Sequence, residues 1–159
     1  MGFITLYGYR HSSTEIYKGQ QLIYINADTN ENGNISKVKA SRDGDGIHIQ
    51  CPDGDYKAPL DISAATYWHK DMLFKQQALN TQNGQLQPIE AVLMESEYIT
   101  VAEERVYADR FLVKIPDQDI HIWYHNRTGE MLDLKLDTKG IEIEYERTTP
   151  VNILTASID

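Results

Sequence analysis

The sequence predicts an all-β fold, an antiparallel meander of about eight to ten strands, curved or rolled into a partial β-barrel. Three observations predict it. Segments rich in β-branched and aromatic residues recur along the chain, and these residue types favour strands. Turn-forming pairs such as Asn-Gly and Asp-Gly separate the segments. In the last third, apolar and charged residues alternate with the period of two that gives a strand one dry face and one wet face.

The first half of the chain is predicted to form successive hairpins. Strands are expected over residues 3–17, 21–27, 35–41 and 47–51. Turns are expected where glycine, asparagine and aspartate gather, at residues 18–19, 28–34, 43–46 and 52–54. Strict alternation within 21–27 places one set of side chains on one face, Leu22, Tyr24 and Asn26, and the other set on the opposite face, Ile23, Ile25 and Ala27.

Residues 60–76 do not alternate and interrupt the strands. Asp61 or Ser63 is suited to cap a short helix, and several apolar residues further along would share one side of it. We therefore expect one long loop or a short helix at about 60–76. This segment is expected to cover one opening of the rolled sheet or its concave face.

The last third has the plainest strand pattern. Strands are expected over residues 107–115, 120–125, 132–136 and 141–145, joined by short turns. The sequence contains no linker, low-complexity run or convincing repeat. It is therefore predicted to form a single β domain over residues 1–149, followed by a C-terminal tail at 150–159.

The charge of the chain disfavours two classes of partner. The 159 residues carry a formal net charge of −9, and a field of that sign repels nucleic acid and anionic membrane surfaces. No apolar run approaches the ~20 residues that a membrane-spanning helix needs. Cys51 is the single cysteine, so no disulfide within the chain is predicted and the compartment stays undetermined.

Two stretches of the sequence partly match metal-binding motifs. The run from Asp28 to Gly33 matches the start of an EF-hand loop, but Lys39 stands at the twelfth position, where calcium needs a bidentate glutamate. We interpret this run as a polar hairpin turn. His121 and His125 share a strand face with Trp123, yet zinc needs three or four ligands, and no third histidine and no cysteine lies near them in sequence. We therefore predict no metal and no cofactor.

Signatures of catalysis are missing from the sequence. Cys51 has no base beside it, because His48 lies three residues away and points to the opposite face of a strand. No phosphate-binding loop is present, and aspartates surround the glycines at 44–46 and 54. Adjacent carboxylates such as Glu103-Glu104 are interpreted as a solvated surface. The chain is therefore expected not to be an enzyme.

Three stretches carry a family resemblance. They span residues 9–33, 66–69 and 79–86. In this order they resemble a bacterial family of uncharacterised proteins, DUF6134. Two later stretches, 122–124 and 140–145, also fit this family and are similar to the related exported β-sheet family DUF3108.

The resemblance implies a periplasmic or otherwise exported protein with no activity that can be transferred. Family members usually carry an export signal and further strands before the first motif, whereas this chain starts almost at that motif. The resemblance therefore implies a member that lacks N-terminal strands, which would leave a sheet edge open. Residues 1–7 are apolar but have no basic region before them, and we interpret them as a strand rather than a signal peptide.

The best candidate site lies in the segment that does not alternate. Tyr67, Trp68 and His69 place two amphipathic rings and an imidazole on a connection, and connections on a rigid scaffold often carry function. Asn80 is expected to fix this loop by hydrogen bonds. These four residues are our ligand-binding candidates. The alternative is that Tyr67 and Trp68 are core anchors that close one end of the sheet.

The sequence leaves three hypotheses for function. The first is a non-enzymatic binding or structural module of the cell envelope, with an apolar small molecule on the concave face of the sheet. The second is a protein-interaction module that self-associates or binds a partner through an open sheet edge. An enzyme of unknown class is third, because no clustered acid and base is evident.

Overall fold

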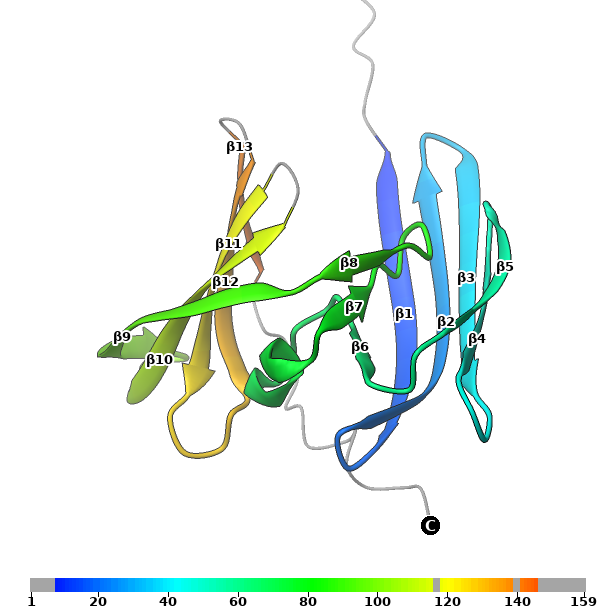
Figure 1. Ribbon diagram of the computed structural model, residues 1–159. Coiled ribbons are helices and arrows are strands. Elements are labelled where there is room, and N and C mark those ends of the chain that lie inside the picture. Colours follow the sequence, from blue (N-terminus) through cyan, green and yellow to red (C-terminus); the bar gives the residue numbers. More distant parts are fainter. Residues whose placement is uncertain (1–7, 116–117, 139–140, 146–159) are drawn as a thin grey trace, which may run out of the picture.

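The computed structural model of the chain describes residues 8–115, 118–138 and 141–145. Its strands form two five-stranded sheets with a three-stranded sheet between them (Figure 1). This arrangement confirms the all-β prediction, and the described sheets stay open rather than closing into a barrel. Residues 3–7 of the first predicted strand, and the predicted tail at 150–159, lie outside the described residues.

The N-terminal sheet is an antiparallel meander in chain order. Its strands are β1 (Tyr9–Lys18), β2 (Gln21–Glu31), β3 (Asn34–Arg42), β4 (Ile47–Cys51) and β5 (Gly54–Ala58). The turn between β2 and β3 has φ angles of 52° at Asn32 and 89° at Gly33. Positive φ at both central residues is what a two-residue hairpin turn requires, so a polar hairpin turn is confirmed here. It is shorter than the turn predicted over 28–34, because residues 28–31 continue β2 and Asn34 begins β3.

A bulge changes the faces of β2. Tyr24 pairs with Ile16 and Leu22 pairs with Tyr17, so Ile23 is an extra residue between the two pairs. An extra residue reverses the alternation on either side of it. Leu22 is therefore buried on the same face as Ile25, and the prediction of strict alternation over 21–27 is wrong at Leu22.

The middle of the chain combines short strands with one turn of 3-10 helix. Its elements are β6 (Ile62–Ala64), η1 (Lys70–Phe74), β7 (Gln77–Leu79) and β8 (Leu86–Pro88). The short helix expected at about 60–76 is η1, and no helix in the described ranges is long and apolar enough to cross a membrane. The strands β6 and β7 run parallel, a departure from the predicted meander. The connection through η1 allows this, because a parallel pair needs a crossover.

The C-terminal sheet is a second antiparallel meander. Its strands are β9 (Glu90–Val101), β10 (Glu104–Ile115), β11 (Gln118–His125), β12 (Met131–Thr138) and β13 (Ile141–Tyr145). All four strands predicted in the last third are present. The long strand β9 was not identified in the sequence, because its mixed pattern leaves most of its side chains exposed on both faces.

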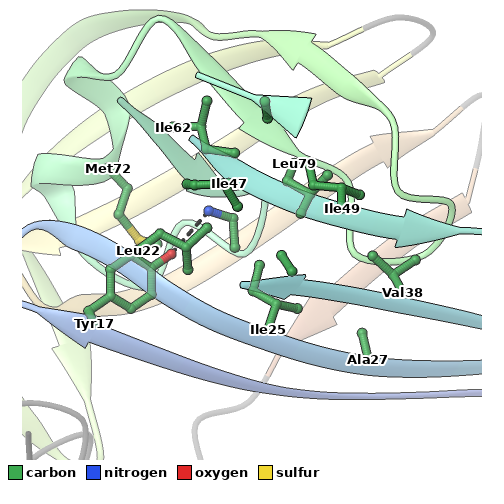
Figure 2. Close-up of a cluster of buried hydrophobic side chains, with 13 residues drawn as sticks. Tyr17, Leu22, Ile25, Ala27, Val38, Ile47, Ile49, Ile62, Met72 and Leu79 are labelled. Atoms are coloured by element: carbon green, nitrogen blue, oxygen red, sulfur yellow. Dashed lines mark hydrogen bonds between the residues drawn. The ribbon is translucent and has the colours of Figure 1, made fainter. Parts of the chain in front are cut away.

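The segment between the two large sheets, residues 60–89, is called the middle segment, and it supplies side chains to two separate hydrophobic clusters. Against the N-terminal sheet it packs Ile62, Ala64, Met72 and Leu79 onto residues of β1 to β5 (Figure 2). Against the C-terminal sheet it packs Tyr67, Leu73 and Ala78 onto residues of β10 to β12. The inner face of the N-terminal sheet is therefore filled by side chains of the chain itself, and a ligand has no wide concave face to occupy there.

Leu79→Ala should destabilise the protein strongly, because Leu79 is fully buried where β7 packs on the N-terminal sheet. Removing a buried leucine side chain leaves a cavity and costs about 2–5 kcal/mol. Urea unfolding followed by circular dichroism measures this loss. The control is Ile35→Ala, whose side chain is 68% exposed and should change stability by less than about 0.5 kcal/mol. Equal effects of the two changes would contradict the assigned core.

Candidate functional site

A row of polar side chains lies on the inner face of β1. The alternation of the strand places His11, Ser13, Glu15 and Tyr17 on that face, and Glu15 and Tyr17 are buried. The row faces the middle segment, because hydrogen bonds join its members to residues 64, 66, 68 and 81. An edge strand is thus attached to the centre of the molecule by polar contacts.

Glu15 is the carboxylate of this row, and it is buried. One carboxylate oxygen accepts hydrogen bonds from Thr66 Oγ1 at 3.0 Å and from Trp68 Nε1 at 3.3 Å, and the other accepts one from Ser13 Oγ at 3.3 Å. Burial raises the pKa of Glu15, and these hydrogen bonds together with one to Tyr17 oppose the rise without cancelling it. Within the described residues no cation pairs with Glu15.

Tyr17 connects β1 to β6. Its hydroxyl oxygen accepts a hydrogen bond of 3.0 Å from the backbone N–H of Ala64, the dashed line in Figure 2. Burial raises the pKa of Tyr17, and the neighbouring Glu15 raises it further. The phenol is therefore neutral over the physiological pH range. A proton-transfer role for Tyr17 would need the opposite shift.

His11 bridges two threonines at the other end of the row. Its Nδ1 lies 2.7 Å from Thr29 Oγ1, and its Nε2 lies 3.1 Å from Thr81 Oγ1. Burial lowers the pKa of His11, which favours the neutral ring. The row thus joins residues from all three stretches that carry the family resemblance.

A small pocket opens beside the Tyr17 end of the row. Its volume is about 130 Å³. Tyr17, Trp68 and Met72 supply its apolar surface, and the two rings meet edge to face with centroids 5.4 Å apart. The remaining lining residues are Gly19, Gln20, Ser63, His69, Asp71 and Lys75.

Hydrogen bonds hold the polar lining of the pocket in place. His69 caps η1, with its Nδ1 accepting a 3.1 Å hydrogen bond from the backbone N–H of Asp71. The Nε2 of the same ring lies 3.1 Å from the carbonyl oxygen of Thr128. Gln20 Nε2 donates to Asp71 Oδ2 at 3.0 Å, and Lys75 Nζ forms a 2.6 Å ion pair with Asp61.

The structure divides the four predicted ligand-binding residues. Trp68 and His69 line the pocket. Tyr67 lies in the other hydrophobic cluster, and its carbonyl oxygen accepts a 2.8 Å hydrogen bond from the Tyr124 hydroxyl. Tyr67 has a φ of 51°, and this left-handed backbone sends it away from Trp68. Asn80 holds its own turn, with its Oδ1 accepting from the backbone N–H of Gln82 at 2.8 Å.

Sequence reasoning missed most of the pocket. Tyr17 could have been placed by counting alternate residues along β1, since its ring shares a face with Glu15. Gln20, Met72 and Asp71 carry no such signal, because a turn and a 3-10 helix bring them together. Asp71 and Met72 lie close to Trp68 and His69 in sequence, whereas only contacts between distant segments bring Gln20 to the same opening.

A second buried carboxylate anchors the middle segment to the C-terminal sheet. Asp109 accepts hydrogen bonds from Ser96 Oγ at 2.6 Å and from Asn126 Nδ2 at 2.9 Å, and Lys70 Nζ lies 3.5 Å away. Burial alone would raise the pKa of Asp109, but these donors and the lysine charge lower it overall. Asp109 is therefore an ionised structural anchor.

The other residues weighed in the sequence do not gather into a site. His121, Trp123 and His125 share one face of β11, as predicted. No group of three or more histidine, cysteine, aspartate or glutamate side chains suited to a metal occurs in the described parts of the chain. Cys51 is half-buried, and its Sγ donates to the carbonyl oxygen of Gly54 at 3.1 Å.

Comparison with known proteins gives one match. A family model described as a domain of unknown function, DUF6134, matches residues 1–148. No curated protein and no solved structure matches the chain. The match confirms the first resemblance noted in the sequence, whereas the relation to DUF3108 and the lack of N-terminal strands stay predictions.

Glu15→Gln should change how stability depends on pH. Because the pKa of Glu15 is raised in the folded state, the folded protein keeps a proton that the unfolded chain releases above its ordinary value of 4.5. Stability from this group is therefore present below pH 4.5 and falls as pH rises toward the raised pKa. In the variant this fall should disappear. Urea unfolding from pH 4.5 upward measures it.

The matched control is Glu104→Gln, which removes an exposed carboxylate at the start of β10. It should leave the difference between acidic and neutral pH as in the natural chain. If Glu15→Gln and the natural chain lost stability equally as pH rose, the burial of an unpaired Glu15 would be refuted.

Proposed function

The chain belongs to the DUF6134 family, and from the geometry of its pocket we propose that it is a non-enzymatic module that binds a small molecule with an apolar body. The observation that carries this proposal is the unfilled space between Tyr17, Trp68 and Met72. Small-molecule sites are typically concave and mostly apolar, with a few polar groups that orient the ligand. An opening of about 130 Å³ with aromatic walls is therefore a candidate ligand site.

The volume of the pocket limits the ligand. An apolar cavity of about 150 Å³ is known to accept benzene, whereas drug-sized ligands occupy sites of about 300 Å³ or more. The pocket, at about 130 Å³, therefore suits a single ring or a short branched chain. The polar side chains of Gln20, His69 and Asp71 suit a polar group on that ligand.

The chemistry around the pocket favours binding over catalysis. Glu15 and Tyr17 are both buried groups whose pKa values are raised, and their hydrogen bonds tie them to the middle segment. A general base needs an accessible proton acceptor in reach of substrate. A place in the bacterial cell envelope is part of the same proposal and rests on the family resemblance alone.

Benzyl alcohol should bind the natural chain saturably, because it combines one ring with one polar group. Shifts of the Trp68 indole N–H and the Met72 methyl in NMR titrations measure this binding. Gln20→Trp places an indole at the pocket and should weaken binding by at least about ten-fold, or about 1.4 kcal/mol.

The matched control is Gln21→Trp, which puts the same ring on the adjacent exposed residue outside the lining. It should bind benzyl alcohol like the natural chain. Absence of saturable shifts in the natural chain, or equal affinities of the two tryptophan variants, would refute the pocket as a ligand site.

A second candidate function is self-association through β9. This strand is the last in its sheet, and in the described chain no strand pairs with its outer edge. Val92, Leu93 and Met94 are about half exposed on it, and exposed apolar edges invite pairing. Glu95 and Glu97 hydrogen-bond to Arg110 and Trp123, so part of the acidic charge along the strand is already engaged. A second copy of the chain would place apolar residues against apolar residues.

Leu93→Lys should abolish this association, because it places a charge in the middle of the exposed apolar run from Val92 to Met94. Light scattering over a concentration series measures the mass of the particle, and a concentration-dependent dimer is expected for the natural chain. Ile35→Lys adds the same charge at an exposed residue of the other sheet and should leave the dimer intact. A monomer at every concentration would refute self-association.

A further inference from the structure

The charges around the pocket do not cancel. Asp71 contributes a carboxylate whose side chain is 39% exposed and whose hydrogen bond from a side-chain donor comes from the uncharged amide of Gln20. Lys75 also lines the pocket, but its ammonium forms a 2.6 Å ion pair with Asp61 and its side chain is largely buried. The pair is neutral as a unit, and the negative charge of Asp71 is left over.

His69 does not supply the missing positive charge. Its Nδ1 accepts from the backbone N–H of Asp71 at 3.1 Å, which requires an unprotonated nitrogen. Its Nε2 lies 3.1 Å from a carbonyl oxygen, which requires a proton there. These two partners together fit the neutral ring. The Asp71 carboxylate lies further from Nδ1, at 3.6 Å, than the backbone nitrogen of Asp71 does, at 3.1 Å.

The aromatic surface of the pocket also favours a positively charged ligand. Aromatic rings attract cations to their faces, tryptophan most strongly, and both Trp68 and Tyr17 line the pocket. Tyr17 remains uncharged, and Glu15 behind Trp68 carries either no charge or a negative one. Lys75 is the cation among the described residues that line the pocket, and its charge is paired with Asp61. The formal net charge of −9 on the chain adds a field of the same sign.

We propose that the pocket selects a positively charged ligand, a small amine or quaternary ammonium compound attached to an apolar body. The apolar body lies against Tyr17, Trp68 and Met72, and the cationic group lies at the opening beside Asp71. This inference rests on the proposed binding function and names its ligand class. It uses Asp71 and Trp68 as the residues that determine specificity.

Three probes of one size test the charge preference on the full chain. Benzylammonium, benzyl alcohol and benzoate carry positive, zero and negative charge on a single ring, and NMR titration at pH 7 measures each affinity. Benzylammonium should bind roughly five-fold more tightly than benzyl alcohol, a preference of about 1 kcal/mol. Benzoate should bind most weakly, and added salt should reduce the differences.

Asp71→Asn should lower the ratio of the benzylammonium affinity to the benzyl alcohol affinity, measured on the same variant, to about one. The matched control, Asp53→Asn, makes the same change in net charge at an exposed residue outside the pocket lining, and the preference should persist. Lys75→Gln gives a second measurement that does not depend on Asp71. It leaves Asp61 without its cation, and the preference for benzylammonium should increase.

The outcomes separate this inference from the function on which it rests. If all three probes bind equally, the cation selectivity is overturned while the binding pocket stands. If Asp71→Asn keeps the preference, the assignment of that preference to Asp71 is overturned. If no probe binds the natural chain, both the pocket and its selectivity are overturned. A preference that Asp53→Asn removes as fully as Asp71→Asn would assign it to net charge and overturn the role of Asp71.

Discussion

The structure depends on the packing of residues 60–89 between two sheets. Each five-stranded sheet has one apolar inner face, and such a face must be covered to be stable in water. The same short segment covers both, with Ile62 and Leu79 on one side and Tyr67 and Ala78 on the other. Burial of a leucine-sized side chain contributes about 1.5–3 kcal/mol. Contacts with this segment position both large sheets and the candidate pocket.

Polar contacts supply the specificity that apolar packing lacks. A hydrophobic inner face tolerates small displacements, whereas a buried carboxylate without its donors is strongly unfavourable. Glu15 and Tyr17 on β1, and Asp109 on β10, each bind the middle segment through directional hydrogen bonds or an ion pair. These contacts fix one register of the segment on each sheet. The pocket lies between Tyr17 of β1 and the residues of η1.

Local patterns predicted most of the strands but little of the site. Alternation and turn chemistry are local, so they placed the hairpins of the N-terminal sheet and the strands from 107 onward. The bulge at Ile23 and the parallel pairing of β6 with β7 depend on partners that are distant in sequence, so no local pattern predicts them. The same is true of the predicted ligand-binding residues. Trp68 and His69 reach the pocket, while the backbone of Tyr67 sends that residue to the opposite cluster.

The positive φ of Tyr67 has a consequence for how the molecule unfolds. The adjacent residues Tyr67 and Trp68 pack in two different hydrophobic clusters, and a single peptide unit joins them. Unfolding of one hydrophobic cluster would therefore displace a residue that is bonded directly to the other cluster. The two sheets should therefore behave as one cooperative unit in hydrogen exchange, although each has the strand number of a domain. A cut in the chain at this point would separate neither half as a stable fragment.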